Sequence, residues 1–294
     1  MPIIENSEFE NKVVVITGAG NGLGRAHAIE YAKRGAKVVI NDLGGNVDGG
    51  GAGDAADAVV AELAEMGCEA VANKASVSDP EGAESIIQTA IDAFGRIDIL
   101  VNNAGILRDR SFKKMTLADW DLVLQVHLSG TAYVTRAAWP HMNAQGYGRV
   151  VLTSSSSGIY GNFGQANYGA AKMGMLGLMN VLALEGAKNN VRVNTLAPAA
   201  ATRMIATIPG REIDPENPPE TSAPKLVSPA VLLMTSEQAP NGVVINAGGG
   251  RFYRAQVFVN ESVDLGVNAA FEDLMDQSEA LMDMSAAKPK TSGP

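Results

Sequence analysis

The sequence predicts an α/β fold, in which helices cover both faces of one doubly wound parallel sheet. Short runs of β-branched and aliphatic residues alternate with helical segments along most of the chain, and this alternation is typical of strands joined by helical crossovers. Crossovers return each strand in the same direction, so the sheet is expected to be parallel. A Gly-rich turn at residues 17–24, directly after the first strand, also favours this class.

Each predicted strand is a short, mostly apolar run. The expected strands comprise residues 12–17, 37–40, 70–72, 97–101, 149–153, 191–196 and 242–246. The predicted helices are longer segments with helical spacing, and the first ends before Gly35, a residue that favours a C-cap. The expected helices comprise residues 23–34, 55–66, 80–94, 120–144, 167–188 and 229–235.

The alternation predicts a single domain over residues 1–250, followed by a C-terminal extension over residues 251–294. Five prolines interrupt residues 199–225 and predict a flexible segment there rather than a regular element. The extension contains an amphipathic patch at residues 271–284, and its polar tail from Lys288 is predicted to be disordered.

The composition excludes several classes of protein. With 294 residues, 46% hydrophobic and 19% charged, the chain is neither a disordered polymer nor a coiled coil. A net charge of −9 without a basic stripe argues against a nucleic-acid partner. No apolar run approaches the roughly 18 residues of a membrane span, and the N-terminus lacks the apolar core of a secretory signal, so we expect a cytoplasmic protein without a membrane partner. The three histidines and Cys68 show no ligand spacing, so no metal is expected.

The Gly-rich turn, TGAGNGLG, lies between the first strand and the first helix. Glycines there let the backbone approach a pyrophosphate, which then sits at the helix N-terminus. An ordinary strand–helix turn is the alternative interpretation. Asp42 ends the second strand, where a carboxylate accepts hydrogen bonds from ribose hydroxyls and repels a 2′-phosphate, so NAD is predicted rather than NADP. The alternative for Asp42 is an ordinary turn residue.

Tyr168 and Lys172 stand one helical turn apart on one face of a predicted helix. A phenol has a reference pKa of about 10, and a neighbouring ammonium is expected to lower the pKa of Tyr168 toward neutrality. Ser155 follows a predicted strand at the edge where α/β sheets bind ligands, so its hydroxyl is expected to hold a substrate oxygen. A lone Tyr-x-x-x-Lys pair is usually a surface pair, but the Gly-rich turn and Ser155 favour a catalytic group.

These motifs, with NNAG at residues 102–105, resemble the short-chain dehydrogenase/reductase family over residues 12–250, which has a Rossmann-type fold. The stretches NDLGG, NNAGILRDRSF, RAAWPHM and SSSSGIYGNFGQANYGAAK resemble more narrowly the dehydrogenase unit of the type 2 peroxisomal multifunctional enzymes. That unit oxidises (3R)-hydroxyacyl-CoA with NAD, and relatives oxidise 17β-hydroxysteroids. The resemblance makes residues 1–250 the dinucleotide-binding and catalytic domain, and residues 199–225 its substrate segment.

The resemblance implies a role for each matching residue. Tyr168 is the expected acid/base, Lys172 lowers its pKa and holds the nicotinamide ribose, and Ser155 orients the substrate oxygen. The expected cofactor-binding residues are Gly18, Asn21, Gly22, Leu23, Gly24, Asp42, Ser76, Val77, Asn102, Asn103, Ala104, Gly105, Tyr168, Lys172 and Thr202.

Three positions depart from the wider family pattern. His127 stands where the family usually has an Asn of a water relay, and it either takes over that catalytic role or is a packed histidine. Ala75 replaces an Asp that often contacts adenine, and residues 197–202 replace a Pro-Gly stretch, so these two contacts with the cofactor are in doubt.

Three functions stay open on the sequence. The first is a stand-alone NAD-dependent (3R)-hydroxyacyl-CoA dehydrogenase, and the second is a 17β-hydroxysteroid dehydrogenase. The third is a non-catalytic NAD-sensing protein, against which the intact Ser155, Tyr168 and Lys172 argue. The small-molecule substrate is therefore an acyl-CoA or a steroid. The resemblance also implies a homodimer or homotetramer, formed through the helices near residues 120–144 and 167–188.

Overall fold

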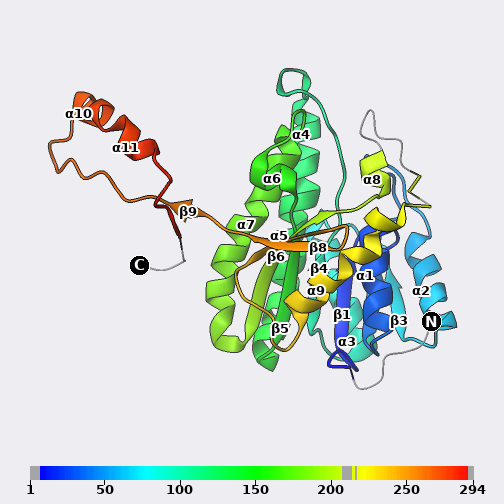
Figure 1. Cartoon of the computed structure of the whole chain (residues 1–294). Coiled ribbons are helices and arrows are strands. Elements are labelled where there is room, and N and C mark those ends of the chain that lie inside the picture. The colour runs from blue at the N-terminus through cyan, green and yellow to red at the C-terminus, as the bar shows by residue number, and fades with distance from the viewer. Residues whose placement is uncertain (1–6, 207–213, 216, 291–294) are drawn as a thin grey trace. The chain divides into compact units, whose positions relative to one another are not determined.

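The computed structural model describes residues 7–206, 214–215 and 217–290 of the chain. Most of these residues form alternating strands and helices (Figure 1). The chain divides into two compact units, Met1–Tyr253 and Arg254–Pro294.

One sheet runs through the first unit in the order β3-β2-β1-β4-β5-β6-β7-β8. The pairs from β3 to β7 are all parallel, with Val14 of β1 beside Val38 on one side and Ile99 on the other. The chain order reverses between β1 and β4, and such a switch point leaves a crevice for a ligand at the carboxyl ends of the strands. The strands are β1 (Val13–Thr17), β2 (Lys37–Asn41), β3 (Ala70–Asn73), β4 (Ile99–Asn102), β5 (Gly148–Thr153), β6 (Val191–Ala199), β7 (Val244–Gly248) and β8 (Arg251–Ala255).

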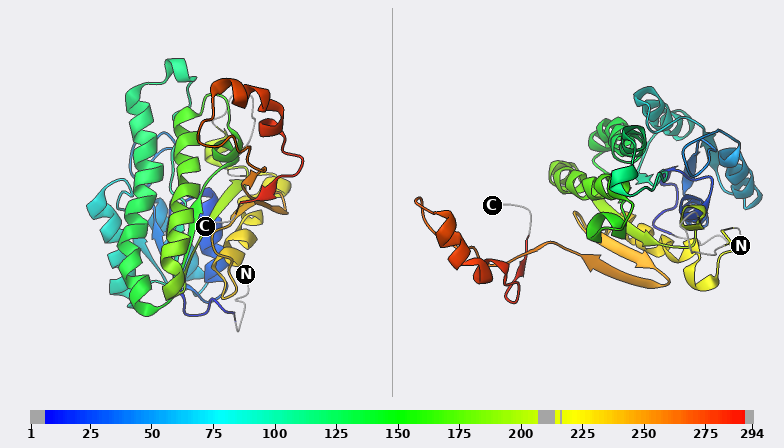
Figure 2. Two further views of the ribbon diagram at one scale, coloured as in Figure 1. Left: turned by 90° about the vertical axis from the view of Figure 1, so that its left-hand side faces the viewer. Right: turned by 90° about the horizontal axis from the view of Figure 1, so that it is seen from above.

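Helices cover both faces of this sheet (Figure 2), and every residue of β1, β4 and β5 is therefore buried. On one face α1 (Gly22–Ala32), α2 (Ala55–Glu65) and α9 (Ser228–Thr235) share a core with the strands. On the other face lie α3 (Pro80–Phe94), α5 (Gly130–Gln145) and α7 (Ala166–Gly186), which contact β1, β4 and β6. The predicted doubly wound parallel sheet is therefore confirmed.

The sequence explains where helix α3 begins and ends. Asp79 caps it, accepting a hydrogen bond from the backbone N–H of Gly82 at 2.8 Å, and Pro80 occupies the first turn. Gly95 ends the helix in the left-handed conformation, at φ 77°.

The structure differs from the predicted elements in three segments. The expected helix 120–144 is two helices, α4 (Leu117–Leu124) and α5, joined by the π-helical turn η2 (Gln125–Ser129). The segment 199–225 contains the short helix α8 (Arg203–Ala206) and the 3-10 turns η4 (Glu220–Ser222) and η5 (Pro224–Leu226), while residues 207–213 and 216 lie outside the described residues. The last predicted strand, 242–246, is displaced to β7, and the sequence missed α6 (Ser156–Tyr160), η1 (Phe112–Lys114) and η3 (Ala187–Asn189).

The second unit has its own small antiparallel pair of strands, β9 (Phe258–Val259) and β10 (Lys288–Pro289). The polar tail predicted to be disordered begins at Lys288, within β10, and residues 291–294 lie outside the described part. The amphipathic patch forms two short helices, α10 (Phe271–Asp276) and α11 (Ser278–Met282), with exposed apolar side chains such as Phe271 and Met282.

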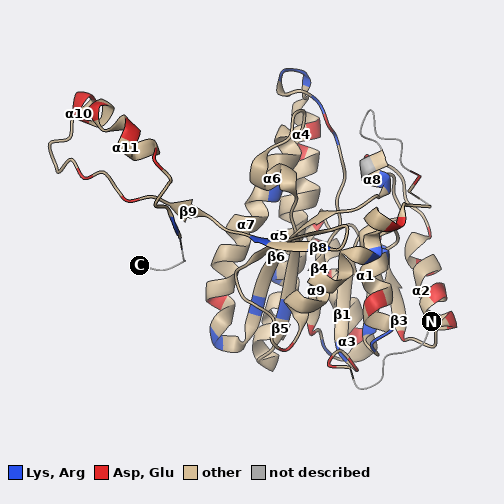
Figure 3. Ribbon diagram, viewed as in Figure 1, with Lys and Arg blue, Asp and Glu red and all other residues tan. Residues whose placement is uncertain are grey.

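Acidic and basic segments are interspersed along the described ribbon rather than gathered into one basic stripe (Figure 3). None of the described helices is both long and apolar enough to pass through a bilayer.

Candidate active site

In the turn between β1 and α1, glycines without side chains leave the backbone accessible. Gly18 has φ +63°, and a Cβ there would lie 2.7 Å from the Cα of Ala104. A Cβ on Gly24 would overlap the carbonyl oxygen of Gly18. Asn21 precedes α1 without a side-chain cap, and Asn21, Gly22 and Leu23 line the pocket, so a pyrophosphate there can accept from the first N–H groups of the helix.

The carboxylate of Asp42 is fixed by two backbone donors. Its Oδ2 accepts from the N–H of Gly20 at 2.8 Å, and its Oδ1 accepts from the N–H of Gly44 at 2.7 Å. A carboxylate has about four acceptor sites, so both oxygens can still accept from ribose hydroxyls. The position therefore fits the adenosine ribose of a dinucleotide.

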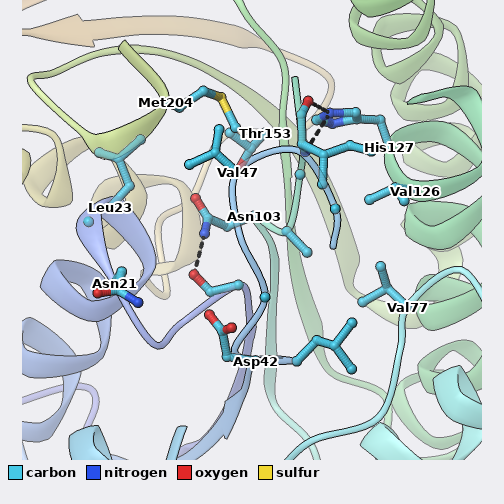
Figure 4. Close-up of a pocket in the computed structure, with 18 of the residues that line it drawn as sticks. Asn21, Leu23, Asp42, Val47, Val77, Asn103, Val126, His127, Thr153 and Met204 are labelled. Atoms are coloured by element: carbon cyan, nitrogen blue, oxygen red, sulfur yellow. Dashed lines mark hydrogen bonds between the residues drawn. The ribbon is translucent and has the colours of Figure 1, made fainter. Parts of the chain in front are cut away.

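The end of β4 supplies a second wall of the pocket. The amide of Asn103 donates to the carbonyl oxygens of Thr17 and Gly18 at 3.1 and 3.0 Å, and Figure 4 shows one bond from this amide. These bonds hold the Gly-rich turn against the residues that follow β4. Asn102 differs, because its side chain is buried and donates to Thr135 Oγ1 at 3.0 Å.

Ser155, Tyr168 and Lys172 meet at the carboxyl edge of the sheet. Ser155 is the N-cap of α6, and its Oγ accepts from the N–H of Ser157 at 3.1 Å. Tyr168 and Lys172 are 8% and 3% exposed, on the first two turns of α7. Lys172 Nζ lies 5.5 Å from the ring centroid of Tyr168 and donates to the carbonyl oxygen of Thr153 at 2.6 Å.

The ionisation of this group differs from the sequence prediction. The pKa of Tyr168 is raised to about 12, mainly by burial; a hydrogen bond with Ser155 opposes this rise, and the charge of Asp109 adds to it. Burial also lowers the pKa of Lys172 to about 7. The expectation that Lys172 brings the Tyr168 phenol toward neutrality is wrong for the protein without ligands, because loss of solvation governs both groups.

His127 lies in the π-helical turn η2 and is 1% exposed. Its Nε2 is 2.8 Å from the carbonyl oxygen and 3.1 Å from the amide nitrogen of Ile106 (Figure 4). Its ring meets that of Tyr168 edge-on at 5.1 Å, and burial holds its pKa well below the usual value, with the charge of Lys172 acting in the same sense. A Cβ on Gly105 would overlap this ring, so Gly105 and His127 fit each other. The imidazole is therefore neutral and packed against the phenol of Tyr168.

These residues enclose a cavity of about 340 Å³. A second cavity of about 410 Å³ shares Ser155, Tyr168 and Met204 with it and extends toward Leu107 and Gln165. Of the predicted site residues, the first cavity is lined by Gly18, Asn21, Gly22, Leu23, Asp42, Ser76, Val77, Asn103, Ala104, Gly105, His127, Ser155, Tyr168, Lys172 and Thr202.

The structure does not bring Gly24 or Asn102 to the cavity wall; both pack behind it. Ala75 lines the cavity beside Ser76 and Val77, but its side chain has no carboxylate that could accept a hydrogen bond from adenine. In the described part of the chain, no group of three or more His, Cys, Asp or Glu side chains is placed to hold a metal ion.

Sequence reasoning missed one whole wall. Leu43, Gly45, Asn46, Val47 and Gly49 line the cavity from the loop after β2. The run of glycines between residues 44 and 53 was the available signal, since so many glycines in one loop indicate close backbone packing.

The two cavities share Ser155 and Tyr168. The first, with the Gly-rich turn and Asp42, fits a dinucleotide, and the second fits another small molecule that would meet the dinucleotide at the Tyr168 phenol. The family model described as short chain dehydrogenase matches residues 12–211. A short-chain type dehydrogenase/reductase of Mycobacterium tuberculosis is 50% identical over 281 residues, which are 95% of this chain and 96% of that protein.

Peroxisomal multifunctional enzyme type 2 of Mus musculus is 54% identical over 244 residues, or 82% of this chain. The chain spans 32% of that longer enzyme. The crystal structure of a short chain dehydrogenase from Mycobacterium avium superposes with a TM-score of 0.82 at 37% identity, and covers 97% of this chain and 98% of that one. The resemblance predicted from the sequence, in its broad and its narrower form, is confirmed.

Proposed function

Because the chain belongs to the short-chain dehydrogenase family, and so is an oxidoreductase with NAD as its cofactor, we propose that it oxidises (3R)-hydroxyacyl-CoA thioesters to 3-ketoacyl-CoA. The observation that carries this proposal is the second cavity, which is lined by Ser155 and Tyr168 together with other polar residues and by apolar residues that include Leu107 and Met204. An acyl chain suits such a wall, and a 3-hydroxyl suits its polar end. The 54% identity with a peroxisomal multifunctional enzyme supports the same substrate class.

Ser155 and Tyr168 handle the oxygen of the substrate. Oxidation of the secondary alcohol breaks one C–H and one O–H bond; bound NAD supplies the acceptor for the hydride. The proton of the hydroxyl goes to Tyr168, while Ser155 donates a hydrogen bond to the same oxygen and fixes its position. With a pKa of about 12, the phenol is protonated at neutral pH before ligands bind, so the ligand-free site is set to donate a proton to a ketone, and oxidation requires its phenolate.

Lys172 and Thr153 prepare the site for the nicotinamide half of the cofactor. The Nζ group is buried and held by the Thr153 carbonyl, so its remaining N–H bonds are available for ribose hydroxyls. Placing a hydroxyl-rich ribose beside Nζ restores polar contacts that burial removed, and this favours the ammonium form of Lys172. The ammonium then stabilises the Tyr168 phenolate that oxidation needs.

His127 acts by position in this proposal. Its neutral ring braces Tyr168 edge-on, and its Nε2 holds the backbone of Ile106 at the cavity wall. The buried Nδ1 has no hydrogen-bond partner among the described residues, so it is the atom that a relay water would use.

Asp42 sets the preference for NAD over NADP. Its carboxylate is already held by Gly20 and Gly44, so it cannot turn away from a ligand without losing two hydrogen bonds. Ribose hydroxyls donate to it, whereas a 2′-phosphate would bring a second anion to the same place.

The assembly we propose is a homodimer or homotetramer formed through α4, α5 and α7. Val181 and Leu184 on α7 are 53% and 60% exposed, and apolar side chains on one helix face favour a protein contact. Light scattering after size exclusion, with Leu184→Lys as the disrupting variant, tests this assembly.

One panel of substrates tests the proposed reaction. NADH formation is measured with a (3R)-hydroxyacyl-CoA, its (3S) enantiomer and a 17β-hydroxysteroid, and we expect turnover of the first. Turnover of the steroid alone would make the chain a hydroxysteroid dehydrogenase. NADH binding without turnover of any substrate would favour a sensor of NAD.

A further inference from the structure

The loop after β2, residues 43–53, is closed at its base and reaches across the cofactor cavity; we call it the strap. At its base the N–H of Gly53 donates to the carbonyl oxygen of Leu43 at 3.1 Å, and a Cβ on Gly44 would overlap Gly53. Inside it, the N–H of Gly49 donates to the carbonyl oxygen of Asn46 at 3.0 Å. The strap is therefore a compact loop whose tip is Val47, Asp48 and Gly49.

The tip docks on residues 106–108, which follow β4 and are distant in the sequence. The N–H of Leu107 donates to the carbonyl oxygen of Val47 at 3.0 Å. The guanidinium Nε of Arg108 donates to the carbonyl oxygen of Asp48 at 2.7 Å. These two bonds tie the strap to the far wall of the cavity.

Apolar packing completes the docked position. Val47 packs against the cluster formed by Ile106, Leu107, Val123 and Tyr168, against which Met204 of the substrate segment also packs. Figure 4 shows Val47 inside the pocket, on the same loop that begins at Asp42. The strap tip and the catalytic phenol thus share one apolar cluster.

The strap also forms part of the dinucleotide site. Five of its residues line the same cavity as Gly18, Asn21 and Gly22 of the Gly-rich turn. A dinucleotide held by that turn and by Asp42 therefore has the strap as an outer wall. Two hydrogen bonds and one aliphatic side chain fasten the tip, which is few enough contacts for it to open and close.

We propose that the strap retains the bound dinucleotide and that Arg108 is the positioning residue that fastens it. Release of NADH then requires the tip to leave residues 106–108. The inference rests on the NAD site and not on the identity of the alcohol, so its test needs no alcohol substrate.

The first test measures how fast NADH leaves. The protein is loaded with NADH and mixed with excess ADP-ribose, and the loss of NADH fluorescence gives the dissociation rate constant. Arg108→Gln removes the charge-assisted bond to Asp48, and we expect dissociation about ten-fold faster than in the wild type. Arg108 also pairs with Asp119 at 3.6 Å, so Asp119→Asn is the control, with a rate within about two-fold of the wild type.

A matched glycine pair tests the tip without changing a charge. Gly49 and Gly51 have φ +91° and +82°, so an alanine strains the backbone in a similar way at both. A Cβ on Gly49 would lie 3.3 Å from Cδ1 of Ile106, whereas a Cβ on Gly51 has Nδ2 of Asn46 as its nearest neighbour at 3.8 Å. Gly49→Ala should therefore accelerate NADH release several times more than Gly51→Ala.

Hydrogen exchange locates the effect. The Leu107 amide should be protected in the NADH complex and lose that protection in Arg108→Gln, while the melting temperature without NADH stays close to that of the wild type. Wild-type release rates in Arg108→Gln and Gly49→Ala would overturn the proposal. Equal acceleration by the two alanines, or by Asp119→Asn and Arg108→Gln, would also overturn it, because strain or the ion pair would then be the cause. A failed substrate panel would leave these rates measurable.

Discussion

At the amino edge of the sheet the buried charges have partners, and at the carboxyl edge several buried polar groups have none. Asp98, at 0% exposure, accepts from the N–H of Val13 and from Arg96. Arg149, at 1% exposure, donates to the carbonyl oxygens of Gly148, Asn190 and Ser236.

At the carboxyl edge, Oδ1 of Asn102, Nδ1 of His127 and Oγ1 of Thr153 are buried without a partner among the described residues. Lys172, beside them, has its pKa lowered to about 7. Buried polar groups without partners lower stability. His127 and Thr153 line the cofactor cavity, so ligand binding there explains their unpartnered atoms. The hydrogen-bonded charges at the amino edge stabilise the fold, whereas the unpartnered polar groups at the carboxyl edge lower its stability beside the active site.

The largest expected effect is at the carboxyl edge. Tyr168→Phe removes the hydroxyl that we propose as the proton acceptor but keeps the ring that packs against His127. We expect kcat to fall by about 10³-fold or more, with NADH affinity within about three-fold of the wild type. Steady-state kinetics and fluorescence titration measure the two. Tyr160→Phe is the control, since Tyr160 is 64% exposed on the neighbouring α6; equal losses in both variants would contradict a special role for Tyr168.

The opposite result is expected at the amino edge. Arg149→Met removes the hydrogen bonds to the carbonyl oxygens of Gly148, Asn190 and Ser236, and it removes the cation that lies 4.3 Å from the Tyr147 ring centroid. We expect the free energy of unfolding to fall by about 3 kcal/mol, while the NADH affinity of the folded protein is unchanged. Urea unfolding measures the loss, with the exposed Arg136→Met as control. A variant as stable as the wild type would show that these bonds do not offset the burial of the guanidinium.

A third prediction uses the pH dependence of stability to measure the cost of burying the Lys172 ammonium group. Its pKa is about 7 in the folded protein against a usual 10.5, so the unfolded chain binds the extra proton between these values, and stability rises with pH over that range. In Lys172→Met this contribution is absent. Between pH 6 and pH 9 the wild type should gain on the order of 2 kcal/mol relative to the variant, as urea unfolding at both pH values would show. Parallel stabilities at the two pH values would contradict the low pKa.

The parts of the molecule that depend on local pattern could be predicted from the sequence. The alternation of strands and helices gave the sheet, because a buried parallel strand needs a continuous apolar run. Ser155, Tyr168 and Lys172 meet in one cavity as expected, because the order of strands in a doubly wound sheet brings their elements to one edge.

Features that depend on distant packing could not be predicted. The raised pKa of Tyr168 follows from its burial among Ile106, Leu107 and Val123, which lie far from it in the sequence. The strap docks on Leu107 through backbone groups, and a sequence pattern carries no signal for such a bond. Asn102 was expected at the cofactor, but its side chain bonds to Thr135, since successive residues at a strand end face opposite sides.

The smallest predicted effect concerns Asp42. It lies at the carboxyl edge, but its carboxylate has hydrogen-bond partners, as the buried charges at the amino edge do. Asp42→Asn keeps the size of the side chain. An amide has only one acceptor oxygen, so it cannot accept from the N–H groups of both Gly20 and Gly44 as the two carboxylate oxygens do. We expect NADH to bind about ten-fold more weakly and the preference for NAD over NADP to shrink. Fluorescence titration with NADH and NADPH measures both. Asp48→Asn removes the same charge from the strap, where Oδ1 accepts only from the N–H of Gly50 among the bonds described, and should leave the preference unchanged. If it shifts the preference as far as Asp42→Asn does, then the general negative charge of the loop, and not a positioned ribose acceptor, selects the cofactor.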